Sequence, residues 1–297
     1  MMKRRRFLCL AAAMAAHPAS GSAAPTRWRG HALGAEAEIT VHGPAALAER
    51  LIAKALAELG AISDQFSLHD EASALSQLNA RGVLAAPDPR MAALLRAVDL
   101  VHGATQGRFD PTVQPLWRAL ALGTDTQAAR ELIGWGRVTH GPGGIGLGPG
   151  QQLTLNGIAQ GYATDRIAAI FRDAGAGRTL VNMGEFQAIG GPWDIGVMDP
   201  RFGLVATRRA RDGAVATSSP GAMVLGATAS HIIDPDRGRP LWSTVSVEAD
   251  NATLADGLST ALCLAGRDEI AALVARLPGL RRVTLVDFDG DIRTLSA

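Results

Sequence analysis

The chain has 297 residues, 47% of them hydrophobic and 19% charged, and its formal net charge at pH 7 is +1. This length allows one large domain or two small ones, with a sizeable core in either case. No sustained basic run follows the first few residues, so the composition disfavours nucleic acid as a partner, and nothing in it points to an anionic membrane surface.

The first 24 residues have the order of parts that is typical of an export signal. Arginines at residues 4–6 precede a short apolar run at residues 9–16, and small residues follow at 22–24. This order resembles a twin-arginine signal, so we expect residues 1–24 to direct export and residues 25–297 to form the mature domain. The apolar run is shorter than the roughly 20 residues that a spanning helix needs. Cleavage and tethering by an uncleaved signal both stay open, and Cys263 is expected to pack in the core.

The first elements of the mature chain are predicted from hydrophobic periodicity. Residues 36–41 alternate as in a half-buried strand, and an amphipathic helix is predicted from Pro44 until Gly60 stops it. A short helix through Leu75 and Leu78 and a longer one over residues 91–102 follow.

Two glycine- or proline-rich stretches come next. The prolines of residues 107–117 predict an extended or turning backbone in which Asp110 and Thr112 either bind a ligand or cap the turn. Residues 141–146 have the glycine spacing of a dinucleotide-binding loop, but Pro149 and Gly150 interrupt the helix that such a loop requires. We therefore predict a hairpin turn there, followed by a strand over residues 152–155.

Residues 154–165 combine a strand end, a glycine-bearing turn and the start of a long amphipathic helix. Gly157 and Gly161 would let the backbone approach a ligand closely, and the amino end of the helix would favour an anion such as phosphate. A well-packed joint without a ligand is the alternative interpretation.

The second half mixes short strands with two helices. Strands are predicted over residues 179–184, 194–198, 214–219, 245–247, 283–287 and 292–295, and helices over residues 254–264 and 268–277. His231 lies near the end of a further strand, before a tight turn that contains Asp234 and Pro235. Because no steady βαβ rhythm appears, we predict an α+β fold with mixed, largely antiparallel sheets and packed helices.

Asp256 and Thr260 are four residues apart on a predicted helix, so their side chains share one face. Two hard oxygen donors on one face suit Mg²⁺, although the same pair can simply cap or solvate a helix end. His231 has two interpretations as well, a satisfied strand histidine or a general acid–base group.

Seven segments together resemble the ApbE family of FAD:protein FMN transferases, and the likeness runs through nearly all of the mature chain. They are residues 67–79, 109–117, 156–165, 181–184, 216–219, 231–235 and 255–260. The resemblance implies an ApbE-like, T-fold-related fold that binds FAD as substrate together with Mg²⁺. It also implies transfer of FMN to a threonine or serine hydroxyl of an acceptor protein, with release of AMP.

The resemblance assigns roles by position. Asp256, Thr260 and the backbone carbonyl of Gly157 would hold the metal, and His231 would accept the proton of the acceptor hydroxyl. The positions that would contact FAD are Leu33, His69, Arg108, Phe109, Asp110, Thr154, Gln160 and Ser230.

The chain departs from the family pattern in several places. Leu33 and Ala35 flank Gly34 where the family has Met-Gly-Thr, His69 replaces an aromatic residue, and Gln160 replaces a lysine. The central variant and the export signal resemble the branch associated with nitrous-oxide reductase maturation. A periplasmic location and a membrane-bound flavoprotein acceptor are therefore expected. Two alternatives are an exported FAD-binding protein without transferase activity and a metal-dependent FAD pyrophosphatase.

Overall fold

The computed structural model describes residues 24–236 and 238–297, so residues 1–23 of the predicted export signal lie outside the described residues. Within the described part of the chain, no helix has both the length and the apolar character needed to cross a membrane.

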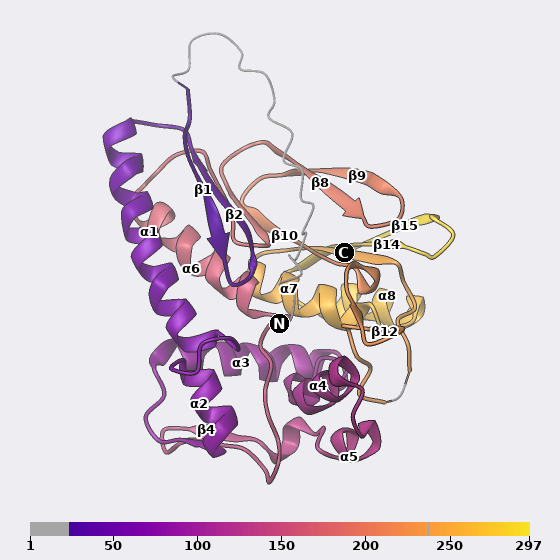
Figure 1. The fold of residues 1–297 in the computed structure, drawn as a ribbon. Coiled ribbons are helices and arrows are strands. Elements are labelled where there is room, and N and C mark those ends of the chain that lie inside the picture. The colour runs from indigo at the N-terminus through magenta and orange to yellow at the C-terminus, as the bar shows by residue number, and fades with distance from the viewer. Residues whose placement is uncertain (1–23, 237) are drawn as a thin grey trace.

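An eight-stranded sheet organises the fold, and every pair of neighbouring strands in it is antiparallel (Figure 1). Its spatial order is β1 (Thr26–Ala32), β2 (Ala35–Val41), β6 (Thr179–Asn182), β7 (Phe186–Ile189), β10 (Gly213–Ser218), β13 (Thr244–Ala249), β14 (Leu280–Val286) and β15 (Ile292–Ser296). The predicted α+β class with largely antiparallel sheets is confirmed.

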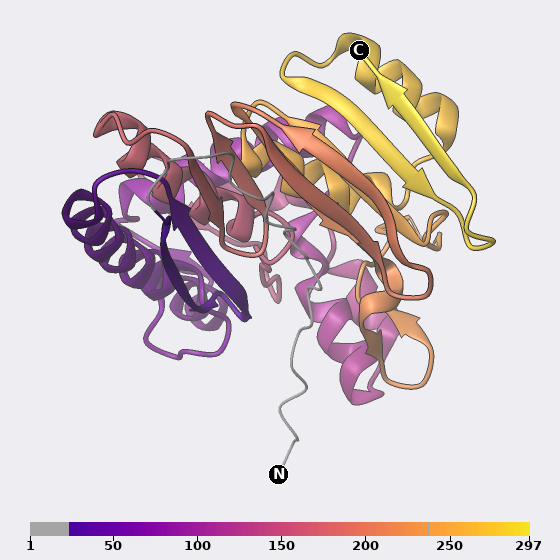
Figure 2. The same ribbon diagram turned by 90° about the horizontal axis from the view of Figure 1, so that it is seen from above.

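The two faces of this sheet are covered by different structures. Four helices with buried residues in the main core lie on one face: α1 (Ala45–Phe66), α6 (Ala159–Asp173), α7 (Ala252–Leu262) and α8 (Arg267–Arg276). On the other face lies a hairpin of β8 (Trp193–Asp199) and β9 (Gly203–Ala210), whose Ile195 and Ala210 join a smaller core with Phe186 and Val215 (Figure 2).

The remaining elements form a mainly helical part below the sheet in Figure 1. Its helices are α2 (Ala74–Arg81), α3 (Pro89–Ala104), α4 (Gln114–Leu122) and α5 (Thr126–Glu131), with short 3₁₀ turns η1 (Pro111–Val113) and η2 (Trp135–Arg137). A small sheet joins β3 (Val83–Leu84), β5 (Gly144–Gly146) and β4 (Thr139–Gly141). Strands β4 and β5 are the hairpin that was predicted in place of a dinucleotide-binding loop.

Three predictions about the elements are wrong for identifiable reasons: the end of one helix, the absence of a helix after residue 113, and a strand over residues 152–155. Helix α1 continues past Gly60 to Phe66, because its apolar face continues with residues that are buried. Helix α4 begins at Gln114 despite Pro115, which sits in the first turn where its missing N–H is not needed. Residues 152–155 form no strand, because the side-chain amide of Asn79 hydrogen-bonds both the N–H and the carbonyl of Leu153, at 2.7 and 2.9 Å.

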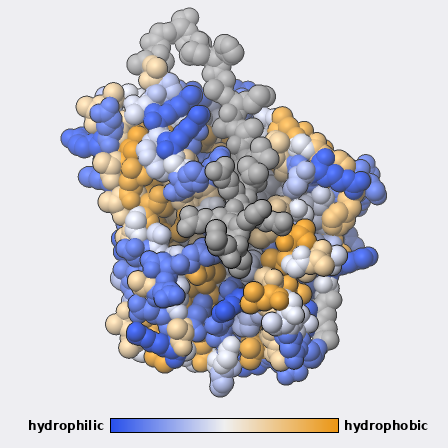
Figure 3. All heavy atoms as spheres, in the orientation of Figure 1, coloured by the Kyte–Doolittle hydropathy of each residue, from blue (hydrophilic) through white to orange (hydrophobic). Residues whose placement is uncertain are grey.

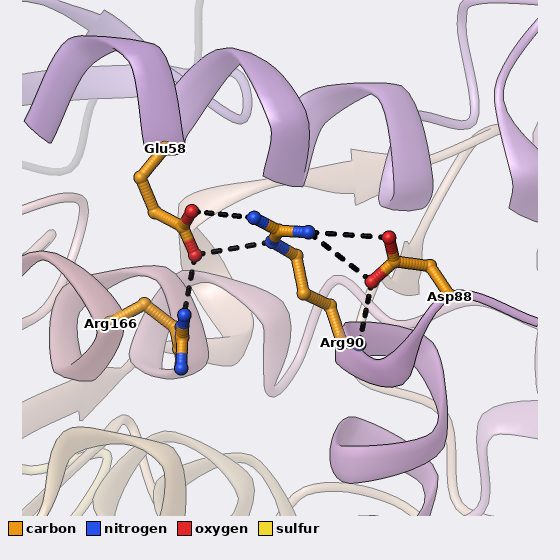
Figure 4. A network of polar contacts seen from close by, with 4 residues as sticks. All are labelled: Glu58, Asp88, Arg90 and Arg166. Carbon is orange, nitrogen blue, oxygen red and sulfur yellow. Dashed lines mark hydrogen bonds and ion pairs between the residues drawn. The ribbon is translucent and has the colours of Figure 1, made fainter. Parts of the chain in front are cut away.

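A polar network ties three of the helices together (Figure 4). Glu58 of α1 accepts hydrogen bonds from Arg90 at the start of α3, at 2.6 and 3.1 Å, and from Arg166 of α6 at 2.9 Å. Asp88, which caps α3, accepts from the same Arg90. The hydrogen bond from Arg90 is the main reason that the pKa of Glu58 is lowered. The network therefore holds α6, which carries part of the site, against α1.

Hydrophobic and hydrophilic residues are interspersed over the face seen in Figure 3. Large exposed apolar side chains include Leu122 at the end of α4 and Val224 in β11 (Val224–Leu225), which pairs with β12 (Ala229–Ser230).

Candidate cation and flavin site

The glycine turn before α6 lies against the last turn of α7. The hydroxyl oxygen of Thr260 is 3.4 Å from the carbonyl oxygen of Gly157. A Cβ at Gly157 would lie only 3.0 Å from that hydroxyl and 3.3 Å from the ring of Phe109. The absence of a side chain at Gly157 thus allows the backbone carbonyl and the Thr260 hydroxyl to face one another.

Asp256 lies one turn before Thr260 on α7 and is buried, at 3% exposure. Its Oδ2 accepts a hydrogen bond of 2.8 Å from the backbone N–H of Gly161 in α6. A Cβ at Gly161 would overlap the carbonyl oxygen of Ala252, so glycine is what lets the two helices approach this closely. Burial raises the pKa of Asp256 to about 7, against the opposing effect of the Gly161 N–H.

The end of strand β10 forms the third side of this cluster. The Ser218 hydroxyl lies 2.7 Å from that of Ser259 and 3.4 Å from that of Thr260. The turn before α6, the end of β10 and the last turn of α7 therefore form one cluster of oxygen atoms, although they are far apart in the sequence.

The chain that leaves β10 connects His231 to this cluster of oxygen atoms. After Ser218 the backbone forms the 3₁₀ turn η3 (Pro220–Ala222), and His231 Nδ1 lies 3.2 Å from the carbonyl oxygen of Met223. A carbonyl can only accept, so this contact favours the tautomer with the proton on Nδ1 and the lone pair on Nε2; the Pro220 carbonyl is a second backbone acceptor near the ring. Burial lowers the pKa of His231, which favours this neutral form near pH 7.

Four of the predicted FAD positions lie near these segments. Phe109 is beside Gly157, and Thr154 joins the same region because its N–H donates to the Pro111 carbonyl at 2.8 Å. The Gln160 side chain packs against Gly184, after β6. Ser230 donates to the Pro220 carbonyl at 3.2 Å, which holds β12 and His231 next to η3.

The other four predicted FAD positions have structural contacts of their own. Arg108 forms a two-point ion pair with Glu269 of α8, with both distances 2.9 Å. Both carboxylate oxygens of Asp110 accept backbone N–H groups, from Thr112 and Trp135, so the capping interpretation describes its observed contacts. His69 is exposed after α1, and Leu33 lies in the β1–β2 turn with a positive φ of 47°.

Sequence reasoning missed one buried acidic residue beside the cluster. Glu185 follows β6 and is 6% exposed, and its Oε2 accepts a 3.0 Å hydrogen bond from the N–H of Thr217. Burial, and next the charge of Asp256, raise the pKa of Glu185 well above its ordinary value. The sequence does contain a signal for Glu185. It is a lone acidic residue between two apolar strand segments, directly after the Asn-Met-Gly sequence at 182–184.

The donors fit Mg²⁺ better than a softer metal. Asp256, Thr260 and the Gly157 carbonyl are all hard oxygen ligands, and Mg²⁺ completes its shell with water and substrate phosphate. Within residues 24–236 and 238–297, no group of three or more His, Cys, Asp or Glu side chains is arranged to hold a metal ion. A separate cavity of about 410 Å³ lies at the other end of α7, around Asp165 and Asn251, away from Thr260.

These features define an α+β protein whose oxygen donors and neutral histidine suit chemistry at a phosphate anhydride. The chain belongs to the ApbE family, whose family model matches residues 33–284. This result confirms the resemblance that the sequence motifs indicated.

Known relatives share both sequence and fold with the chain. It is 31% identical over 247 residues to the FAD:protein FMN transferase of Rhodobacter capsulatus, covering 75% of this chain and 47% of that protein. The FAD:protein FMN transferase of Klebsiella pneumoniae (strain 342) is 29% identical over 298 residues, covering 89% of this chain and 85% of that protein. The ApbE protein of Thermotoga maritima superposes with a TM-score of 0.79 at 28% identity, covering 91% of this chain and 97% of that chain. The chain thus spans about half of the first relative, and the relatives named here from Rhodobacter and Klebsiella are transferase enzymes.

Proposed function

We propose that this protein transfers FMN from FAD to a threonine or serine hydroxyl of an acceptor protein and releases AMP, with Mg²⁺ at Asp256, Thr260 and Gly157. The observation that carries the proposal is the 3.4 Å approach of the Thr260 hydroxyl to the Gly157 carbonyl, beside the buried Asp256. The names of the relatives support the flavin substrate and the transfer reaction.

The reaction is a displacement at phosphorus. The acceptor oxygen attacks the phosphorus of the FMN half of FAD, a new P–O bond forms, and the bond to the AMP phosphate breaks as AMP leaves. His231 Nε2 accepts the proton of the attacking hydroxyl, while Nδ1 stays bound to the Met223 carbonyl and fixes the ring. A base positioned in this way contributes roughly 10²- to 10⁴-fold in rate.

The start of α6 supports the proposed cation site. Ile158 makes no side-chain cap there, but the N–H of Gly161 in the first turn donates to Asp256, so the positive end of the helix stabilises the carboxylate that would hold Mg²⁺. When bound, Mg²⁺ would offset the negative charge that develops on the phosphate oxygens. Gly157 and Gly161 leave room for the backbone and α7 to approach this charge.

The replacement His231→Ala tests the role of the base. Incubation of the variant with FAD, Mg²⁺ and a threonine-containing acceptor domain should produce roughly 10²- to 10⁴-fold slower covalent flavinylation, with FAD still bound. The matched control is His140→Ala, because His140 pairs with Asp99 in the small helical part. Unchanged transfer in the His231 variant would reject the role.

The products of the unmodified protein distinguish the alternatives. Acceptor-bound FMN with AMP is expected for transfer. Free FMN with AMP would indicate a pyrophosphatase, and unchanged FAD would indicate a binding protein without transferase activity.

We further place the reaction in the periplasm, with a membrane-bound redox protein as the acceptor. The basis is the arginine-containing N-terminal sequence and its apolar run. Cell fractionation of a host with and without twin-arginine transport tests this placement. Equal amounts in the periplasm of both hosts would contradict it.

A further inference from the structure

The site contains two buried carboxylates that lack a compensating cation. Asp256 is 3% and Glu185 6% exposed, and each accepts one backbone hydrogen bond, from Gly161 and Thr217 respectively. Among the described residues, no arginine, lysine or histidine lies within ion-pairing distance of either. Buried charges in proteins are normally paired or coordinate a metal.

The backbone places Glu185 beside the donors of the proposed cation site from two directions. Its carbonyl oxygen accepts from the Thr164 hydroxyl at 3.0 Å, and Thr164 follows Gly161 by about one turn on α6. Its carboxylate binds the N–H of Thr217, and the next residue, Ser218, contacts the Thr260 hydroxyl. Glu185 therefore lies between the α6 and β10 segments that also border Asp256 and Thr260.

One oxygen of Glu185 has no hydrogen-bond donor among the described residues, since the Thr217 N–H is bound to Oε2. That hydrogen bond alone does not call for a charge, because the amide oxygen of glutamine would accept it equally well. A divalent cation, in contrast, would offset the negative charge of both carboxylates at once.

We propose that Glu185 is the second carboxylate of the cation site, so that two buried negative charges, from Asp256 and Glu185, hold the divalent ion. This inference rests on the proposed function, because it concerns the same Mg²⁺. It adds a residue that composition and motif spacing did not reveal, and it assigns that residue to the binding of the ion itself.

The experiment titrates the metal-free full chain with Mg²⁺ alone and with Mn²⁺ alone, in the absence of FAD, by calorimetry. Glu185→Gln keeps the acceptor for Thr217 and removes the charge, so the dissociation constant should rise roughly 10- to 100-fold. Glu248→Gln is the matched control, because Glu248 is a partly buried carboxylate of β13 that pairs with Arg282 at 3.1 Å. Its metal affinity should equal that of the unmodified chain.

Asp256→Asn separates failure of this inference from failure of the proposed function. If Asp256→Asn loses metal binding and Glu185→Gln does not, the cation site stands and the role of Glu185 is overturned. If both variants bind Mg²⁺ as the unmodified chain does, the cation site and the inference are both overturned.

Melting temperatures test whether Glu185 acts only in folding. Metal-free Glu185→Gln should melt at the same or a higher temperature than the unmodified chain, and its stabilisation by Mg²⁺ should shrink. A lower melting temperature with unchanged metal affinity would overturn the proposal. If melting temperature and affinity both fall, Glu185→Asp decides: recovery of affinity with the restored charge supports the proposal, and failure to recover overturns it.

Discussion

Glu58 and Glu185 are both substantially buried glutamates at helix contacts, yet their surroundings are opposite. Glu58 is bound by the guanidinium groups of Arg90 and Arg166, and its pKa is lowered (Figure 4). Glu185 receives one backbone N–H, and its burial together with the nearby charge of Asp256 raises its pKa. A buried carboxylate with its own cations holds helices together, whereas one without them is suited to bind a cation from outside.

The paired region, which is the Glu58 network, and the unpaired region around Asp256 and Glu185 share helix α6. Arg166 lies on the same helix as Gly161, but Gly161 meets α7 through its own hydrogen bond to Asp256 and through core packing. Changes at the Glu58 network should therefore alter stability alone, and changes at the site should also alter cation binding.

The largest expected effect is that of Gly161→Ala, which disrupts the unpaired region. The new Cβ would overlap the Ala252 carbonyl and lie 2.7 Å from the Asp256 Cβ, so α6 and α7 must move apart. We expect a loss of about 1 to 3 kcal/mol in the free energy of unfolding, and weaker Mg²⁺ binding. Chemical denaturation and calorimetry measure the two effects.

Gly60→Ala is the control for this change, because Gly60 lies within α1 and a Cβ there would meet nothing within 4 Å. It should stabilise the protein by roughly 0.5 to 1 kcal/mol. Equal behaviour of the two alanine variants would contradict the close packing at Gly161.

A smaller effect is expected for Glu58→Gln in the paired region. At pH 7 the free energy of unfolding should fall by about 1 kcal/mol, because charge-assisted hydrogen bonds from two arginines are replaced by weaker ones to the neutral amide oxygen of glutamine. The folded pKa of Glu58 lies below its ordinary value of 4.5, so the carboxylate stabilises the fold above that value.

The difference between the unmodified chain and Glu58→Gln should therefore shrink as the pH falls below 4.5 and through the folded pKa. Denaturant unfolding at pH 7 and at lower pH measures this, and Mg²⁺ affinity at pH 7 should be unchanged. A large loss of Mg²⁺ affinity would mean that the two regions are not separable.

The smallest expected effect concerns the pH profile of transfer. His231 is partly buried and has no counter-charge, and its burial favours the neutral form and lowers its pKa below 6.5. A neutral base loses activity as it gains a proton, so the rate should hold between pH 7 and 6.5 and fall below that value. Single-turnover transfer with saturating Mg²⁺ measures the profile, and an acid limb at higher pH would contradict it.

The sequence predicted many of the elements because their hydrophobic periods are local. The alternation in β2 and the helical spacing in α7 and α8 give each element one buried face whatever it packs against. One prediction failed because a distant group replaced the expected partner, when Asn79 took the place of a neighbouring strand beside Leu153.

The site divides in the same way. Seven segments together identified the family from the chain itself, and the resemblance then assigned Gly157, Asp256 and Thr260 as the predicted cation donors. The contacts of the other predicted residues depend on which groups lie close together in the fold. Arg108 pairs with Glu269 and Asp110 binds backbone N–H groups, although the motif indicated flavin contacts for both.

What the sequence by itself determined about this protein is its α+β class and its family, because periodicity and motif spacing are properties of neighbouring residues. Only the tertiary structure decided which buried charges have partners. Glu58 pairs with two arginines, and Glu185 lies near the charge of Asp256, because helices and strands remote in the sequence pack together there, and no local pattern records that proximity.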